Sequence, residues 1–228
     1  MSDLRLVVFD VDGTLIDSQD FILEAMRRAF SRMGLPAPTN AQTLSIIGLS
    51  LEQAVSTIAP DLSPVEAQAG AEHYRQSFIE MRAETGGEAA SPMYPGARDA
   101  LERLYLQDET LMGVATGKAK RGLAHAYKSH GIGHYFVTHQ TADGHPSKPN
   151  PSMLYQAMSD TGVDANRSVM IGDTEFDILM GKAAGFATIG VSWGYHPVAR
   201  LQKAEPDYII ESFDRLDNVL DRIWMRTS

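Results

Sequence analysis

Short apolar runs that end at small or acidic residues constrain the fold of this chain most strongly. Runs at residues 4–9, 111–115 and 168–171 have the length and composition of buried parallel strands, and helical patterns follow them. Two further candidate strands lie at 187–191 and 207–210. Helical patterns are found near 97–107, 118–130, 151–161, 175–184 and 214–224. This alternation predicts an α/β fold with a doubly wound (Rossmann-like) parallel sheet and helices on both faces.

Residues 18–90 interrupt the alternation. Apolar residues recur there at helical spacing in 21–33, 51–58 and 65–83, and no convincing strand lies among them. Glycine, serine and proline near 86–92 mark the end of this segment. We therefore predict a helical cap domain at 18–90, inserted into an α/β catalytic core formed by 1–17 and 91–228.

Charge and composition exclude several classes of protein. Lys and Arg number 20 against 29 Asp and Glu, a net charge of −9, and no dense basic patch suggests nucleic-acid binding. No segment reaches the roughly 18 consecutive apolar residues that a membrane span requires. Cysteine is absent, which excludes thiolate metal sites and cysteine nucleophiles. We expect a soluble, cytoplasmic protein, a monomer or homodimer, with no nucleic-acid or membrane partner.

A pair of aspartates ends the first predicted strand. Asp10 and Asp12 are two positions apart, so an extended backbone directs both carboxylates to the same side, and Gly13 permits a sharp turn after them. One carboxylate could attack a phosphorus atom while the other handles the proton of the leaving oxygen. Alternatively, these are turn-forming aspartates at an ordinary strand end.

Two further segments suit a phosphate group. Thr116-Gly117-Lys118 offers a hydroxyl and backbone N–H groups at a predicted helix start, although Thr116 could be an ordinary cap with Lys118 in solvent. Lys148 comes just before another predicted helix, and the Pro-Asn-Pro that follows it is explained as a helix start. Lys148 itself could neutralise both a carboxylate and a phosphoryl oxygen.

More carboxylates follow the strand at 168–171. Asp173 is a hard oxygen ligand of the kind Mg²⁺ prefers, and Asp177 returns to the same helix face four residues later. Acidic residues also simply favour a helix N-terminus. However, Asp10, Asp12 and Asp173 would repel one another severely at one end of the sheet unless a divalent cation lay among them.

The order of these motifs resembles that of the haloacid dehalogenase-like hydrolase superfamily. The motifs are Asp-x-Asp-Gly-Thr, Thr-Gly-Lys, Lys-Pro-x-Pro and Gly-Asp-Thr-x-x-Asp, within a match from residue 7 to about residue 193. The resemblance is greatest for the branch with a helical cap, which includes phosphoglycolate phosphatases and β-phosphoglucomutases. It implies a magnesium-dependent phosphatase, a phosphoric monoester hydrolase, that acts on a small phosphorylated metabolite.

The resemblance also implies a role for each matched position. Asp10 would be the nucleophile that forms an aspartyl-phosphate, and Asp12 would protonate the leaving group and then activate water. Thr116, Gly117 and Lys148 would bind the transferring phosphoryl group, and Lys148 would also steady Asp10.

The same resemblance implies how the metal is held. Mg²⁺ would be bound by the Asp10 carboxylate, the main-chain carbonyl of Asp12 and the Asp173 carboxylate, with Asp177 behind them in a second layer.

The cap would close over the substrate and exclude water. Gly48-Leu49-Ser50 lies between two predicted cap helices and is our candidate for a substrate-facing turn. Arg75 and Arg82 are candidate anchors for a second anionic group, although a solvated helix face is the favoured interpretation of each arginine.

Three other functions compete with phosphatase activity. A phosphomutase of the β-phosphoglucomutase type would use the same residues, and the sequence does not separate the two. Dehalogenation is disfavoured because Asp12 is present. A non-enzymatic phospho-acceptor module would use an aspartate, a hydroxyl, a lysine and magnesium, but it would lack the inserted cap and Asp12.

Overall fold

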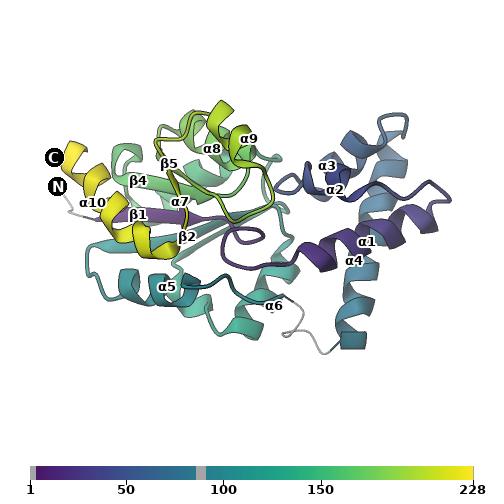
Figure 1. Cartoon of the computed structure of the whole chain (residues 1–228), viewed down its shortest axis with the longest axis horizontal. Coiled ribbons are helices and arrows are strands. Elements are labelled where there is room, and N and C mark those ends of the chain that lie inside the picture. Colours follow the sequence, from purple (N-terminus) through teal and green to yellow (C-terminus); the bar gives the residue numbers. More distant parts are fainter. Residues whose placement is uncertain (1–3, 86–90, 228) are drawn as a thin grey trace.

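A parallel six-stranded sheet forms the centre of the molecule in the computed structural model, which describes residues 4–85 and 91–227 (Figure 1). The strand order is β3-β2-β1-β4-β5-β6, and all neighbouring pairs are parallel. The chain therefore begins mid-sheet and winds first toward one edge and then toward the other, as the doubly wound prediction requires. The strands are β1 (Arg5–Phe9), β2 (Thr110–Thr116), β3 (Thr138–Thr141), β4 (Ser168–Gly172), β5 (Ala187–Val191) and β6 (Tyr208–Ile210).

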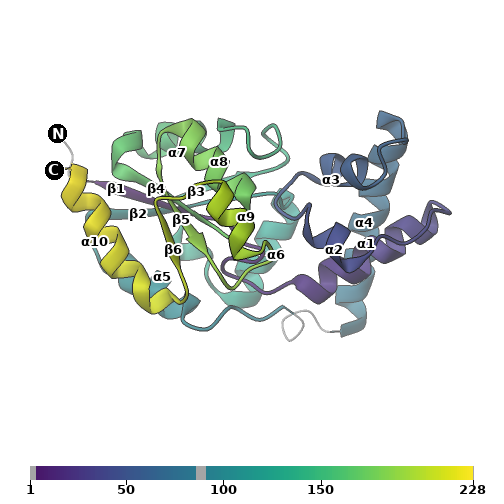
Figure 2. The ribbon, with the colours of Figure 1, turned by 45° about the horizontal axis from the view of Figure 1, so that its top comes forward.

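Helices cover both faces of this sheet because successive residues of a buried strand point to opposite sides. The core helices, which lie on both sides of the sheet in Figure 2, are α5 (Ala97–Tyr105), α6 (Lys120–His130), α7 (Ser152–Thr161), α8 (Glu175–Ala184), α9 (Val198–Lys203) and α10 (Leu216–Thr227). Val7 and Phe9 of β1 pack in one hydrophobic cluster with α5, α6 and α10, whereas Leu6 and Val8 pack in another with α7 and α8.

The strand β3 is absent from the sequence-based prediction. Its residues are Thr-His-Gln-Thr, so it carries no apolar run. Thr138 and Gln140 are nevertheless buried, because both side chains donate hydrogen bonds to the Asp160 carboxylate on α7. A buried polar network thus replaces the apolar side chains that usually mark such a strand. The short helices α9 and α2 (Asn40–Leu44) were also not predicted.

Four helices lie together at the end of the molecule remote from both termini (Figures 1 and 2). Their apolar faces form a separate hydrophobic cluster that includes Phe21, Met26, Ala29 and Tyr74. We call these helices the cap: α1 (Gln19–Arg32), α2, α3 (Leu51–Ile58) and α4 (Pro64–Thr85). The predicted end of the insertion at 86–90 lies outside the described residues. No described helix is both long and apolar enough to cross a membrane.

Candidate active site

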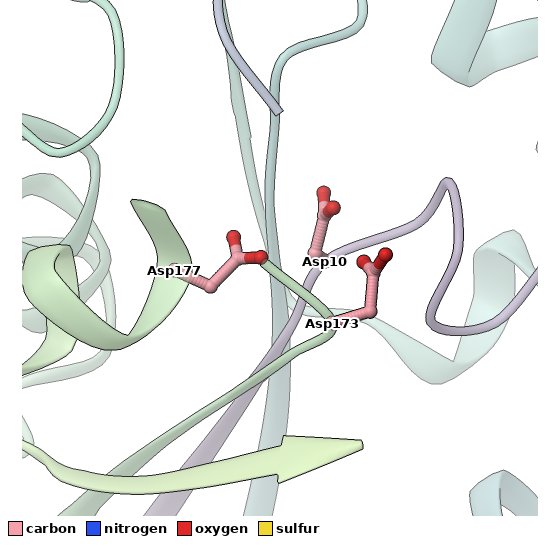
Figure 3. Close-up of side chains that lie close together, drawn as sticks. All are labelled: Asp10, Asp173 and Asp177. Atoms are coloured by element: carbon pink, nitrogen blue, oxygen red, sulfur yellow. The ribbon is translucent and has the colours of Figure 1, made fainter. Parts of the chain in front are cut away.

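Three buried aspartates meet at the carboxyl ends of two neighbouring strands. Asp10 follows β1, Asp173 follows β4, and Asp177 lies in the first turn of α8. Because Phe9 is paired with Ile171 in the parallel register, the residues that follow these strands emerge side by side (Figure 3). One carboxylate oxygen from each aspartate lies within 4.8 Å of the others, and no other such group of acidic or histidine side chains occurs among residues 4–85 and 91–227.

Two hydrogen bonds and two closely packed glycines fix the Asp173 side chain. Its Oδ1 accepts a hydrogen bond from Thr14 Oγ1 at 3.1 Å, and its Oδ2 accepts one from the Tyr195 backbone N–H at 2.8 Å. Gly13, with a φ of +85°, and Gly194 approach so closely that a Cβ on either residue would overlap the Asp173 side chain. The turn after Asp12 therefore requires glycine both for its backbone conformation and for space.

Lys148 lies between two of the carboxylates. Its Nζ donates a hydrogen bond to Asp177 Oδ1 at 2.6 Å and forms an ion pair with Asp10 Oδ1 at 3.0 Å. Thr174 N–H donates to the other Asp177 oxygen at 3.0 Å, so both Asp177 oxygens are occupied. Asp10 Oδ1, by contrast, is buried and accepts no hydrogen bond. Asp10 is thus the carboxylate whose geometry leaves an oxygen for another ligand.

The electrostatics of the cluster favour an added cation. Burial raises the pKa of Asp10 to about 7; the Lys148 charge opposes this shift, and the Asp177 and Asp12 carboxylates add to it. Burial, followed by the Asp177 and Asp10 carboxylates, raises the pKa of Asp173 well above its usual value. One lysine therefore does not compensate these carboxylates. A divalent cation bound to Asp10 and Asp173 would favour their ionised forms, so the residues present fit such an ion.

Asp12 is held by a different set of residues. Lys118 Nζ lies 2.6 Å from Asp12 Oδ2, and Ser18 Oγ donates a hydrogen bond to Asp12 Oδ1. The interpretation of Lys118 as a solvated residue is therefore wrong, because its side chain is largely buried in this ion pair. The Asp12 carboxylate is not one of the three clustered carboxylates. This leaves its side chain free of the Asp10 cluster.

The Gly48-Leu49-Ser50 turn of the cap rests on the core. The carbonyl oxygens of Gly48 and Leu49 would each lie 2.8 Å from a Cβ at Gly117, so the two backbones approach as closely as glycine allows. The Ser50 N–H donates to Ser147 Oγ at 2.8 Å. The cap turn predicted from sequence therefore covers the phosphate-binding candidates, next to Thr116 and one residue from Lys148.

A chamber of about 350 Å³ lies between the cap and the core. Asp10, Asp12, Thr116 and Gly117 line it from the core, and Gly48 and Leu49 line it from the cap. Lys148, Asp173, Asp177 and Ser50 do not line it. Lys148 therefore does not line the chamber itself, but it contacts Asp10, which does.

Comparison with known proteins agrees with this geometry. Residues 7–191 match the family model described as haloacid dehalogenase-like hydrolase. The chain belongs to this family. It is 37% identical over 213 residues to a probable phosphatase, IndB, of Dickeya dadantii, covering 92% of this chain and 91% of that protein. It is 33% identical over 227 residues to a phosphoglycolate phosphatase of Vibrio parahaemolyticus, covering 96% of each chain.

Solved structures of this family share the whole fold. A haloacid dehalogenase-like hydrolase of Streptococcus pneumoniae, SP0104, has a TM-score of 0.80 and 25% identity, covering 96% of this chain and 99% of that one. A predicted phosphatase of Clostridium acetobutylicum has a TM-score of 0.83 at 23% identity, over 96% and 99%, and shows the fold alone. With the curated relatives, these findings establish the family resemblance, and the chain is a phosphatase.

Several residues of this haloacid dehalogenase-like site were not predicted from sequence. Lys118 and Ser18 hold Asp12, and Thr14 holds Asp173. The backbone at Gly194 and Tyr195 also contacts Asp173. Thr14 and Lys118 belong to the matched motifs, and this membership could have indicated that they lie in the site. Ser18 belongs to none of these motifs.

Proposed function

We propose that this phosphatase depends on Mg²⁺ and hydrolyses a small phosphorylated metabolite, phosphoglycolate-like or sugar-phosphate-like, through an aspartyl-phosphate on Asp10. One observation supports this most directly. Asp10 and Asp12 line the same chamber, but their carboxylates have different partners, Lys148 for Asp10 and Lys118 with Ser18 for Asp12. Two carboxylates in different environments can perform different tasks.

In the first step, an Asp10 carboxylate oxygen attacks phosphorus while the bond from phosphorus to the leaving oxygen breaks. Asp12 gives its proton to that oxygen, so the alcohol leaves neutral. In the second step, Asp12 removes a proton from water, and the resulting hydroxide attacks phosphorus. Inorganic phosphate leaves, the Asp10 carboxylate is restored, and Asp12 is again protonated.

The other residues position and neutralise the reacting groups. Thr116 and Gly117 line the chamber, where the Thr116 hydroxyl and the Gly117 backbone N–H would donate hydrogen bonds to phosphoryl oxygens. The ion pair with Lys148 holds Asp10 in the orientation needed for attack. The Gly48-Leu49 turn excludes water from the chamber during the first step.

The acidic cluster would hold the metal. The Asp10 and Asp173 carboxylates and the Asp12 main-chain carbonyl would bind Mg²⁺, and Asp177, which accepts hydrogen bonds from Lys148 and Thr174, would stand behind them in a second layer. When bound, the ion would neutralise charge on the phosphoryl oxygens, as phosphoryl transfer generally requires.

A phosphate-release screen over phosphorylated metabolites with Mg²⁺ tests this proposal. We expect turnover by the wild type, loss of turnover on chelation, and no turnover by Asp10→Asn, because an amide is a far poorer nucleophile. Asp20→Asn, an exposed aspartate at the start of α1, is the matched control and should retain activity.

Two outcomes would contradict the proposal. Near wild-type activity of Asp10→Asn would exclude the proposed nucleophile. Formation of an isomerised sugar phosphate without release of free phosphate would identify a phosphomutase instead.

A further inference from the structure

Two arginines of the cap helix α4 line the same chamber but differ in their partners. Arg75 is neutralised twice, by Glu52 at 2.6 Å and by Glu72 at 3.4 Å. Arg82 forms no ion pair with any carboxylate of residues 4–85 and 91–227 within 4.0 Å. From sequence both arginines had the same interpretation, whereas the structure shows different partners for them.

Arg82 is half-buried in the chamber wall. Its guanidinium lies 4.6 Å from the centroid of the Phe78 ring, which also lines the chamber. Lys118 Nζ lies 5.6 Å from the same centroid. Burial lowers the pKa of Arg82, and the Asp12 charge opposes that shift without cancelling it. The aromatic ring fixes the guanidinium without satisfying its hydrogen-bond donors.

The apolar side chains that line the rest of the chamber make it unfavourable to bury the Arg82 guanidinium there without a ligand. The cap contributes apolar side chains to the chamber, among them Ile22, Met26, Ile46 and Leu49. The remaining cations of the chamber are accounted for, since Lys118 pairs with Asp12 and Arg121 is exposed on α6. A half-buried guanidinium beside apolar side chains gains most from an anion that accepts its hydrogen bonds.

We propose that Arg82 binds a second anionic group of the substrate, a carboxylate or a phosphate other than the one transferred at Asp10. This inference rests on the proposed phosphatase function and deepens it. It assigns the substrate to phosphomonoesters that carry a second negative charge, and it makes Arg82 the residue that selects them.

Matched substrate pairs test this inference. Phosphoglycolate is compared with its amide, which differs only in the carboxylate charge, and glucose 1,6-bisphosphate is compared with glucose 6-phosphate. Both pairs are assayed with the wild type, Arg82→Gln and Arg82→Lys. Arg75→Gln is the control, because Arg75 lines the same chamber but is already neutralised.

We expect Arg82→Gln to lower kcat/KM for the second-anion member of one pair by roughly 10- to 100-fold, through KM, because a charge-assisted hydrogen bond is lost. For the member that lacks the second anionic group, kcat/KM should change less than about twofold. Arg82→Lys should restore part of the loss. Arg75→Gln should affect both members of each pair alike. A response in the first pair identifies a carboxylate, and a response in the second identifies a phosphate.

Equal losses for both members of both pairs, or no loss in either pair, would overturn the inference. Binding measured by calorimetry separates this failure from a failure of the proposed function. On the Asp10→Asn background, which removes the nucleophile, Arg82→Gln should still weaken binding of phosphoglycolate or of the bisphosphate. Unchanged affinity for both probes would exclude Arg82 as the anion site, whether or not the wild type releases phosphate.

Discussion

Lys148 Nζ lies 2.6 Å from the Asp177 carboxylate, and both side chains are fully buried. Burial by itself would lower the pKa of Lys148, but the Asp10 and Asp177 carboxylates raise it above its ordinary value, so this lysine is charged at neutral pH. Lys148 therefore places a fixed positive charge 3.0 Å from an oxygen of the proposed nucleophile, Asp10.

Replacing this lysine should cost stability as well as activity. Lys148→Met leaves Asp10 and Asp177 buried beside Asp173 without their cation, and breaking a buried pair in this way typically costs about 3 kcal/mol or more. We expect that decrease in the free energy of urea unfolding at neutral pH without added metal. Lys120→Met, at an exposed lysine, is the control. A decrease below about 1 kcal/mol would contradict the supporting role.

Asp12→Asn should distinguish good from poor leaving groups. An alkyl phosphate needs a proton on its leaving oxygen, so its turnover should fall roughly 100-fold or more. The rate of the first turnover of p-nitrophenyl phosphate, measured as the burst of nitrophenol, should fall far less, because nitrophenolate leaves without a proton. Equal losses in the burst and in alkyl phosphate turnover would show that Asp12 does not transfer the proton.

Gly117→Ala should impair cap closure. Its Cβ would lie 2.8 Å from the Gly48 and Leu49 carbonyl oxygens, which are backbone atoms and cannot rotate away. We expect kcat/KM to fall about tenfold, with the unfolding free energy changed by less than about 1 kcal/mol, since the contact joins cap to core. Gly122→Ala is the matched control, because its Cβ would meet nothing closer than 3.9 Å. Equal activity of the two variants would refute closure at this contact.

His196 should make stability depend on pH. Burial lowers its pKa to about 4, from an ordinary value of 6.5, and the Arg200 charge lowers it further, so the folded state holds it neutral. Its contribution is therefore present above pH 6.5 and lost as the pH falls toward 4, since the unfolded chain binds the proton first. Between pH 7 and pH 5, the wild type should lose about 2 kcal/mol relative to His196→Asn. Parallel pH profiles of the two proteins would contradict this.

Much of the fold follows from local patterns. The strand at 187–191 and the helices at 51–58 and 175–184 were predicted with the observed bounds, because apolar periodicity and helix-start residues are local properties. Other ends differ by up to three residues, as with 214–224 against Leu216–Thr227. The edge strand β3 was missed because its buried side chains are polar and donate hydrogen bonds to Asp160 on α7, which is distant in the sequence.

The sequence by itself determined the motifs that follow strands and most of the alternation of strands and helices, since both depend on neighbouring residues; only β3, α2 and α9 were missing among the strands and α-helices described. It did not determine which charge meets which. Lys118 with Asp12, and Lys148 with Asp10 and Asp177, are partners that only the folded sheet brings together. The tertiary structure likewise decided that Arg75 is neutralised while Arg82 faces the chamber without a carboxylate among the described residues. Periodicity reports which face a residue occupies, whereas long-range packing decides what that face meets.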